Sequence, residues 1–274
     1  MKHSLLTFWL TALVMLFGQS LSAHDFEVDG IYYTYLSQTD KTVAVSFKGD
    51  FYDSYSNEYS GNVVIPESVT YSGTTYSVTS IEVDAFWGCT GLTSIEIPNS
   101  VTSIGSSAFY WCTGLTSINI PNSVTSIGSE AFYNCKGLTS INIPNSVTSI
   151  GWSAFYGCTG LTSINIPNSV TSIGNNAFYG CTGLTSIVIP NSVTSIGGSA
   201  FYGCTGKLLI HCNIANATSS YDGWFYGSKF NEVEIGEEVT SIGTYAFSGC
   251  TGLTSIEIPN SVTSIGKYAF NNCI

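Results

Sequence analysis

The sequence predicts a β-rich solenoid, a stack of coils built from short parallel strands, turns and short 3₁₀ or helical segments, with a β cap at the N-terminal end. The first observation is a ladder of cysteines 23 residues apart: Cys89, Cys112, Cys135, Cys158, Cys181 and Cys204, resumed at Cys250 and Cys273. The second is a leucine with the same period: Leu92, Leu115, Leu138, Leu161, Leu184 and Leu253. A fixed period of this length is typical of units that bury their apolar side chains only by stacking.

The third observation is the pattern within one unit. Ile118, Asn119 and Ile120 alternate between apolar and polar as a short strand does, and Pro121 ends the strand because proline cannot extend a ladder. Gly128 suits a sharp turn, and residues 129–135 have room for only one helical or 3₁₀ turn. Each unit therefore predicts one coil, and neighbouring coils share a parallel ladder about 4.8 Å apart.

Residues 1–23 have the pattern of a secretory signal peptide. A basic start at Lys2 precedes an apolar stretch from Leu5 to Phe17, and small polar residues lead to a cleavage position near Ala23. The apolar stretch is shorter than the about 20 residues that a membrane-spanning helix needs. We therefore expect export, without membrane insertion of the mature chain.

Residues 24–77 predict the N-terminal β cap. The segment "IYYTYLSQTDKTVAVSF" is rich in strand-forming residues, and "VVIPESVTYSGTTYSVTSI" predicts a partial first coil with an inserted hairpin around Tyr71 to Ser77. A solenoid needs such a cap because its end coil exposes the core and an open strand edge.

Residues 78–274 predict the solenoid itself, in which the unit at 207–229 is degenerate. Gly227 stands in place of a ladder cysteine, and Lys207 and Phe230 occupy leucine positions. The sequence shows no evident C-terminal cap, which predicts either a fragment of a longer chain or a last coil that is frayed or covered by a partner.

Charge excludes one class of partner. Only 9% of the residues are charged, the net charge is −11, and the chain contains no arginine. Nucleic acid is excluded because phosphate binding depends on clustered lysine and arginine.

The cysteine ladder predicts free, buried thiols. Equivalent residues in adjacent coils have Cβ atoms about 4.8 Å apart with parallel directions, whereas a disulfide prefers about 3.8 Å and a near-perpendicular torsion. Cys212, aligned with Ile189, is predicted to lie in the core as well.

No catalytic, metal or cofactor site is predicted. His211 is the one histidine beside a cysteine, but adjacent residues of a strand point to opposite faces, so His211 is predicted to be a solvated side chain at the outward strand position. The cysteine period offers no convergent set of metal ligands.

Two surfaces are candidates for binding. One is the row of outward strand residues Asn119, Asn142 and Asn165, which could also serve only to solvate the sheet. The other is a ridge of aromatic residues that follow the core phenylalanines, and these rings could instead pack on one another as spacers. The ridge comprises Tyr110, Tyr133, Tyr156, Tyr179 and Tyr202, with Trp152 nearby and Trp224 in the degenerate unit. Trp224 keeps the register of the core phenylalanine, although a slip of one residue would bury Phe225 instead.

The segment "LTSINIPNSVTSIGSEAFYNC", residues 115–135, resembles the BspA-like subgroup of bacterial leucine-rich repeats, and the resemblance extends over residues 78–274. It implies a leucine-rich-repeat-like right-handed coil stack, flatter than the usual horseshoe. It further implies a non-catalytic adhesion protein, secreted or at the cell surface of a bacterium, that binds host matrix or cell-surface proteins. The residues leave two alternatives open, namely glycan binding along the aromatic ridge and a structural spacer.

Overall fold

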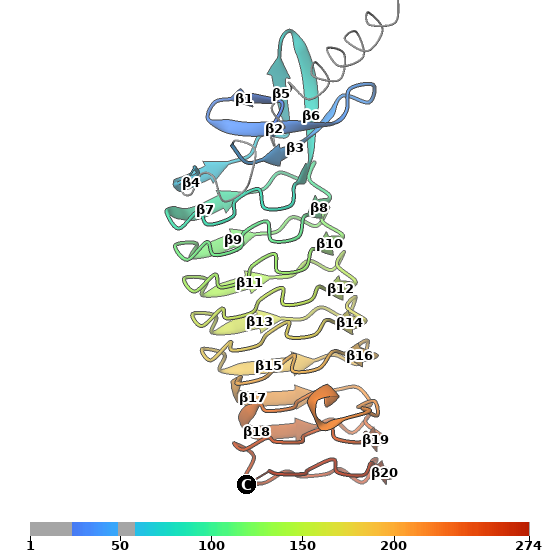
Figure 1. Cartoon of the computed structure of the whole chain (residues 1–274). Coiled ribbons are helices and arrows are strands. Elements are labelled where there is room, and N and C mark those ends of the chain that lie inside the picture. Colours follow the sequence, from blue (N-terminus) through green and yellow to red (C-terminus); the bar gives the residue numbers. More distant parts are fainter. Residues whose placement is uncertain (1–23, 49–57, 274) are drawn as a thin grey trace, which may run out of the picture.

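The computed structural model describes residues 24–48 and 58–273, and within them the chain forms one elongated stack of coils (Figure 1). Most coils give one strand to each of two sheets, so the strands lie in two columns along the stack. The β-rich solenoid predicted from the sequence is confirmed. The predicted signal peptide, residues 1–23, lies outside the described residues.

The N-terminal end is a small β unit joined to the stack. Strands β1 (Phe26–Val28), β2 (Ile31–Ser37) and β3 (Thr42–Ser46) are antiparallel, and β3 pairs in parallel with β6 (Thr74–Ile81). Strand β5 (Ser68–Tyr71) forms a hairpin with β6. This β unit therefore covers one edge of the stack with continuous main-chain hydrogen bonds.

The first sheet has eight strands, all parallel along the stack. They are β4 (Gly61–Val64), β7 (Leu92–Glu96), β9 (Ser117–Asn119), β11 (Ser140–Asn142), β13 (Ser163–Asn165), β15 (Ser186–Ile189), β17 (Thr205–Ile210) and β18 (Lys229–Ile235). In the regular coils like residues pair with like, for example serine with serine and asparagine with asparagine. Since β4 pairs with β7, the first coil already begins within residues 24–77.

The second sheet has ten strands and continues from β6 through very short strands. These are β8 (Ser103–Ile104), β10 (Ser126–Ile127), β12 (Ser149–Ile150), β14 (Ser172–Ile173) and β16 (Ser195–Ile196). It ends at β16, and β19 (Ser241–Ile242) and β20 (Ser264–Ile265) form a separate two-stranded sheet. The break coincides with the degenerate unit.

Apolar side chains of both sheets and of the turns fill the space between them. Phenylalanines of successive coils stack at ring-centroid distances of 5.1 to 5.4 Å from Phe86 to Phe201. Each of these rings is fully buried and nearly parallel to the next. One coil could not cover such a ring on both faces, which is why the core exists only in the stack.

The predicted helical turn over residues 129–135 is instead a series of tight turns. Glu130 and Asn134 have φ values of +57° and +55°, in the left-handed region, which interrupts any right-handed helix. The only helical segment of the described residues is the 3₁₀ helix η1 (Ser220–Asp222) in the degenerate unit.

The degenerate unit corrects the predicted alignment. Strand β17 pairs with β15 so that Ile189 faces Ile210, only 21 residues later. In the next step Ile210 faces Ile235, 25 residues later, so the two steps together equal two 23-residue periods. Lys207 therefore pairs with Ser186 rather than filling the leucine position, and both His211 and Cys212 lie beyond the strand. A slip of two residues keeps the alternation of faces, so apolar side chains stay in the core.

Candidate functional site

The ridge tyrosines, which we call the tyrosine ladder, form one continuous stack. The rings of Tyr110, Tyr133, Tyr156, Tyr179 and Tyr202 follow one another at 4.5 to 4.7 Å between centroids, with interplanar angles of 3° to 11°. Burial raises the pKa of the phenol groups of Tyr133, Tyr156 and Tyr179. Each internal ring has both faces covered by its neighbours, so mainly ring edges and hydroxyl groups remain for contact with solvent.

The two tryptophans of the predicted ridge differ in environment. Trp152 is 47% exposed, whereas Trp224 is only 4% exposed. Phe225 holds the stacking position between Phe201 and Phe247, at 5.7 and 5.1 Å from their ring centroids. The prediction of Trp224 as a surface residue is wrong, because the chain slips by one residue here and both Trp224 and Phe225 are buried.

Outward strand residues form a second feature, which we call the amide row: Asn119, Asn142 and Asn165. They lie on β9, β11 and β13, directly opposite one another in the ladder, and all three are exposed. Exposed serines of the same strands form a parallel row. Farther along the sheet, Val188 and Leu209 occupy the same outward position, followed by Glu234.

The cysteine ladder has a role that sequence reasoning missed. The thiols donate hydrogen bonds to phenylalanine carbonyls of the preceding coil, for example Cys158 Sγ to Phe132 O at 3.1 Å. The free cysteines Cys89, Cys112, Cys135, Cys158, Cys181, Cys204, Cys212 and Cys250 are buried, and Cys273 is half-buried. Burial raises the pKa of Cys158 and Cys204 to about 12, so these thiols are poor nucleophiles and poor metal ligands. The one signal of this thiol-to-carbonyl bond in the sequence is that a cysteine recurs at a small buried position where alanine, which cannot donate a hydrogen bond, would also fit.

His211 contacts the carboxylate of Glu238 at the surface through its Nδ1 atom. Burial raises the pKa of the neighbouring Cys212 thiol to about 12. The described residues contain no group of three or more histidine, cysteine, aspartate or glutamate side chains that could hold a metal ion.

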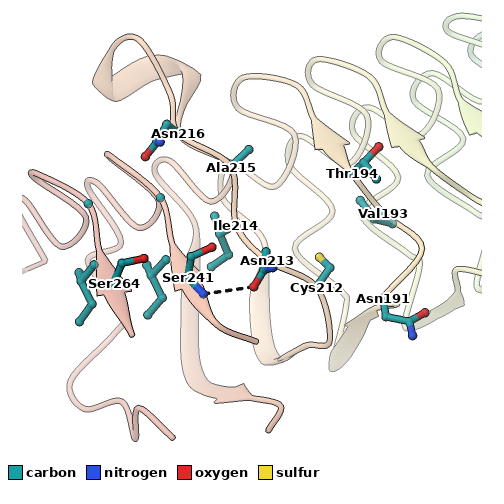
Figure 2. Close-up of a pocket in the computed structure, with 14 residues that line it drawn as sticks. Asn191, Val193, Thr194, Cys212, Asn213, Ile214, Ala215, Asn216, Ser241 and Ser264 are labelled. Carbon is teal, nitrogen blue, oxygen red and sulfur yellow. Dashed lines mark hydrogen bonds between the residues drawn. The ribbon is translucent and has the colours of Figure 1, made fainter. Parts of the chain in front are cut away.

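The degenerate coil contacts the coil of β19 through asparagine side chains as well as main-chain hydrogen bonds (Figure 2). Asn213 Oδ1 accepts hydrogen bonds from the main-chain N–H groups of Thr240 at 2.7 Å and Ser241 at 3.1 Å. Asn216 Oδ1 accepts from the N–H of Thr244 at 2.8 Å. These side chains tie residues 213–216 to the coil of β19, which is why this stretch turns away from β16.

A groove of about 610 Å³ lies at this break. Figure 2 shows Asn191, Val193 and Thr194 on one side, and the segment from Cys212 to Asn216 nearer β19. None of its lining residues is an aspartate, glutamate, lysine, arginine or histidine. The sequence shows that the unit at 207–229 is irregular. It does not predict the groove, because the groove depends on Asn213 and Asn216 binding the coil of β19.

The comparisons with known proteins agree with this architecture. The family described as "BspA type Leucine rich repeat region" matches the chain in six copies, over residues 79–208 and 218–274. No curated protein is similar enough in sequence to count as a match. Among the described residues, no helix is long and apolar enough to cross a membrane.

Two solved structures of bacterial proteins are similar to this chain. The pneumococcal vaccine antigen PcpA is 19% identical, with 91% of this chain and 79% of that chain covered and a TM-score of 0.52. A leucine rich cell surface protein of Faecalibacterium prausnitzii is 23% identical over 90% and 86% of the two chains, with a TM-score of 0.49. At such identities the likeness concerns the fold alone. The family match over most of the chain, together with the coil stack that it describes, shows that this protein belongs to the BspA-type leucine-rich repeat family.

Proposed function

We propose that the protein is an exported, non-catalytic binding scaffold that attaches a bacterial surface to proteins of a host or of neighbouring cells. The observation that supports this best is the amide row on the eight-stranded sheet. Three coils with the same strand sequence present asparagine side chains in register on a framework held by main-chain ladders. The backbone of such a framework is already ordered, so binding costs little further backbone entropy, which favours affinity.

The chemistry of this face suits protein ligands. Amide and hydroxyl groups both donate and accept hydrogen bonds, so they can pair with main-chain groups as well as polar side chains. Val188, which is 41% exposed, stands beside Leu209 at the end of the row and adds an apolar contact. A polar face with a small apolar region resembles the mixed composition of protein interfaces.

Catalysis is not part of the proposal. The thiols of the core are held protonated by burial, and His211 is engaged with Glu238 rather than with a nucleophile. Glycan binding by ring stacking receives no support from the tyrosine ladder, because sugars stack on ring faces and the internal faces are already covered.

Binding of the immobilised full chain to a panel of matrix proteins, including fibronectin and fibrinogen, and to glycans at physiological salt tests the proposal. The variant N119A/N142A/N165A removes the amide row, and S126A/S149A/S172A is a matched control on the other sheet. We expect saturable binding to a matrix protein that the asparagine variant weakens about tenfold or more, since a few hydrogen bonds contribute about 1 kcal/mol each.

The serine variant should bind as the unchanged chain does. Saturable binding that survives loss of the amide row would place the binding surface elsewhere. No binding to any protein of the panel would contradict matrix adhesion, and binding to glycans alone would favour the sugar-binding alternative.

A further inference from the structure

The outward face of the eight-stranded sheet repeats once per coil. In β9, β11 and β13 each serine pairs with the equivalent serine, and each asparagine pairs with the equivalent asparagine. The serine pairing extends to β7 on one side and to β15 on the other. The amide row therefore lies beside a second row, which we call the serine row: Ser94, Ser117, Ser140, Ser163 and Ser186. Members of each row are about 4.8 Å apart, and the serine row is about 19 Å long.

Most side chains of the two rows are free to bind a ligand. Threonines next to these strands are already engaged, because Thr116 Oγ1 donates to Thr93 O at 3.1 Å and Thr139 Oγ1 donates to Thr116 O at 3.3 Å. Within residues 24–48 and 58–273, by contrast, the exposed side chains of the amide row, and of the serine row from β9 to β15, form no hydrogen bond with the protein. Amide and hydroxyl groups both donate and accept hydrogen bonds, so each coil can bind a polar partner in the same way.

The two rows form a surface with little charge. Only Glu130 and Lys136 are charged between residues 97 and 206, and neither lies on a strand. An uncharged polar ligand therefore fits here, whereas a charged one would lose hydration without meeting an opposite charge. A second copy of this chain has the same spacing, but each copy carries a net charge of −11, which opposes face-to-face association.

A ligand fits several coils at once only if its own groups repeat at the spacing of the coils. A contact that suits one coil then recurs at the next, and linked contacts give an affinity that no single coil provides. Cross-β fibrils have this property, because identical strands stack in register about 4.7 to 4.8 Å apart and their polar side chains form ladders along the fibril. An irregular protein surface lacks such a repeat, so it cannot make the same contact with every coil.

We propose that the serine row and the amide row bind the flank of a cross-β protein fibril, whose stacking direction is parallel to that of the coils. Asparagine, glutamine or serine ladders of the fibril exchange hydrogen bonds with the two rows, as opposed polar ladders do between the sheets of a fibril. A hollow of about 360 Å³ next to the amide row, lined by Asn119, Asn142, Pro98 and Pro121 among others, gives room to the longer side chain of glutamine. This inference rests on the proposed protein-binding function and names the class of partner.

The probe is a fibril of an end-blocked, uncharged heptapeptide rich in asparagine and glutamine. Fibre diffraction verifies its repeat of about 4.8 Å, and solid-state NMR verifies parallel, in-register strands. Co-sedimentation of the full chain with these fibrils should show saturable binding. The same peptide kept as a soluble monomer at equal concentration should not compete, because each molecule presents its side chains only once.

Exchanging the two row residues within a coil separates spacing from composition. S140N/N142S interrupts both rows in one coil and keeps the same side chains, so it should weaken fibril binding about fivefold or more. S117N/N119S/S140N/N142S/S163N/N165S makes the exchange in three successive coils and restores the repeat, so it should bind about threefold or more tighter than S140N/N142S. T148S/S149T exchanges two residues on the other sheet and should leave binding unchanged. Far-UV circular dichroism verifies that all three variants fold.

The inference is overturned if S140N/N142S binds fibrils as the unchanged chain does, or if the exchange in three coils restores nothing. Absence of fibril binding together with matrix binding that depends on the amide row would overturn the fibril as partner and leave the proposed function intact. Fibril binding without binding to any matrix protein would support this inference and contradict matrix adhesion. Sedimentation showing a dimer of the chain that S140N/N142S dissociates would overturn the inference, because a second copy would then be the occupant.

Discussion

Two glycines of neighbouring coils should respond very differently to the same substitution. Gly160 lies outside the left-handed region, but a Cβ added there would stand 2.3 Å from Lys136 O of the preceding coil. Gly180 has a φ of +71°, and an added Cβ would meet only Gly157 Cα at 3.9 Å. Gly160 is therefore required by the close approach of two coils, and Gly180 only by its backbone conformation.

The expected magnitudes follow from this difference. Gly160→Ala forces the coils about 1 Å apart to reach ordinary contact, which stretches cross-coil bonds such as Thr162 N to Thr139 O at 3.0 Å. Losing several such bonds and the packing beneath them should lower the free energy of unfolding by about 3 kcal/mol or more. Gly180→Ala should cost about 1 kcal/mol or less, because left-handed strain of about 1 kcal/mol is partly offset by a less flexible unfolded chain.

Urea unfolding followed by far-UV circular dichroism measures both changes. A loss of 1 kcal/mol corresponds to about 2 to 4 °C in Tm for a chain of this size, so Gly160→Ala should lower Tm by about 6 °C or more. Equal urea midpoints for the two variants, or a larger loss for Gly180→Ala, would refute the claim that coil spacing depends on Gly160.

Three further predictions concern the core and its charges. The ring of Phe155 lies 5.3 Å from that of Phe132 and 5.4 Å from that of Phe178 between centroids, so Phe155→Ala should lower the free energy of unfolding by about 3 to 5 kcal/mol. A loss below about 1 kcal/mol in urea unfolding would contradict a continuous ring stack. Iodoacetamide at pH 8 should modify the half-buried Cys273 first and leave Cys158 unmodified until urea unfolds the protein, because burial raises the pKa of Cys158 to about 12. Peptide mass spectrometry measures both reactions, and early modification of Cys158 would show that the cysteine ladder is open to solvent. Burial raises the pKa of Asp84 to about 6, above its value of 3.8 as a free side chain, so its contribution to stability is complete below about pH 4 and is lost as the pH rises through 6. Asp84→Asn should therefore raise the urea midpoint at pH 7.5 and change it little at pH 4, and the reverse order would show that the carboxylate is stabilised by the fold.

The amino-acid sequence was sufficient for the architecture of the regular coils. The strand around Ile118, the burial of Phe132 and the outward side chain of Asn119 all follow from the period and from alternation along a strand. The strand predicted over 118–120 is observed one residue earlier, at Ser117–Asn119. Repetition makes these predictions secure, because each coil has a near-identical neighbour and so meets the same environment.

Tertiary structure alone decided the contacts between coils and the fate of the degenerate unit. The sequence left open whether Tyr133 is exposed or stacked, and only the spacing of adjacent coils brings its ring to 4.5 Å from that of Tyr156. The register of the unit at 207–229 depends on three kinds of contact with other coils. These are the pairing of β17 with β15, the burial of Phe225 and the hydrogen bonds of Asn213. These contacts join residues more than 20 positions apart, so no local pattern could resolve them, and their outcome opens the groove lined by residues 212–216 and the coils of β19 and β20.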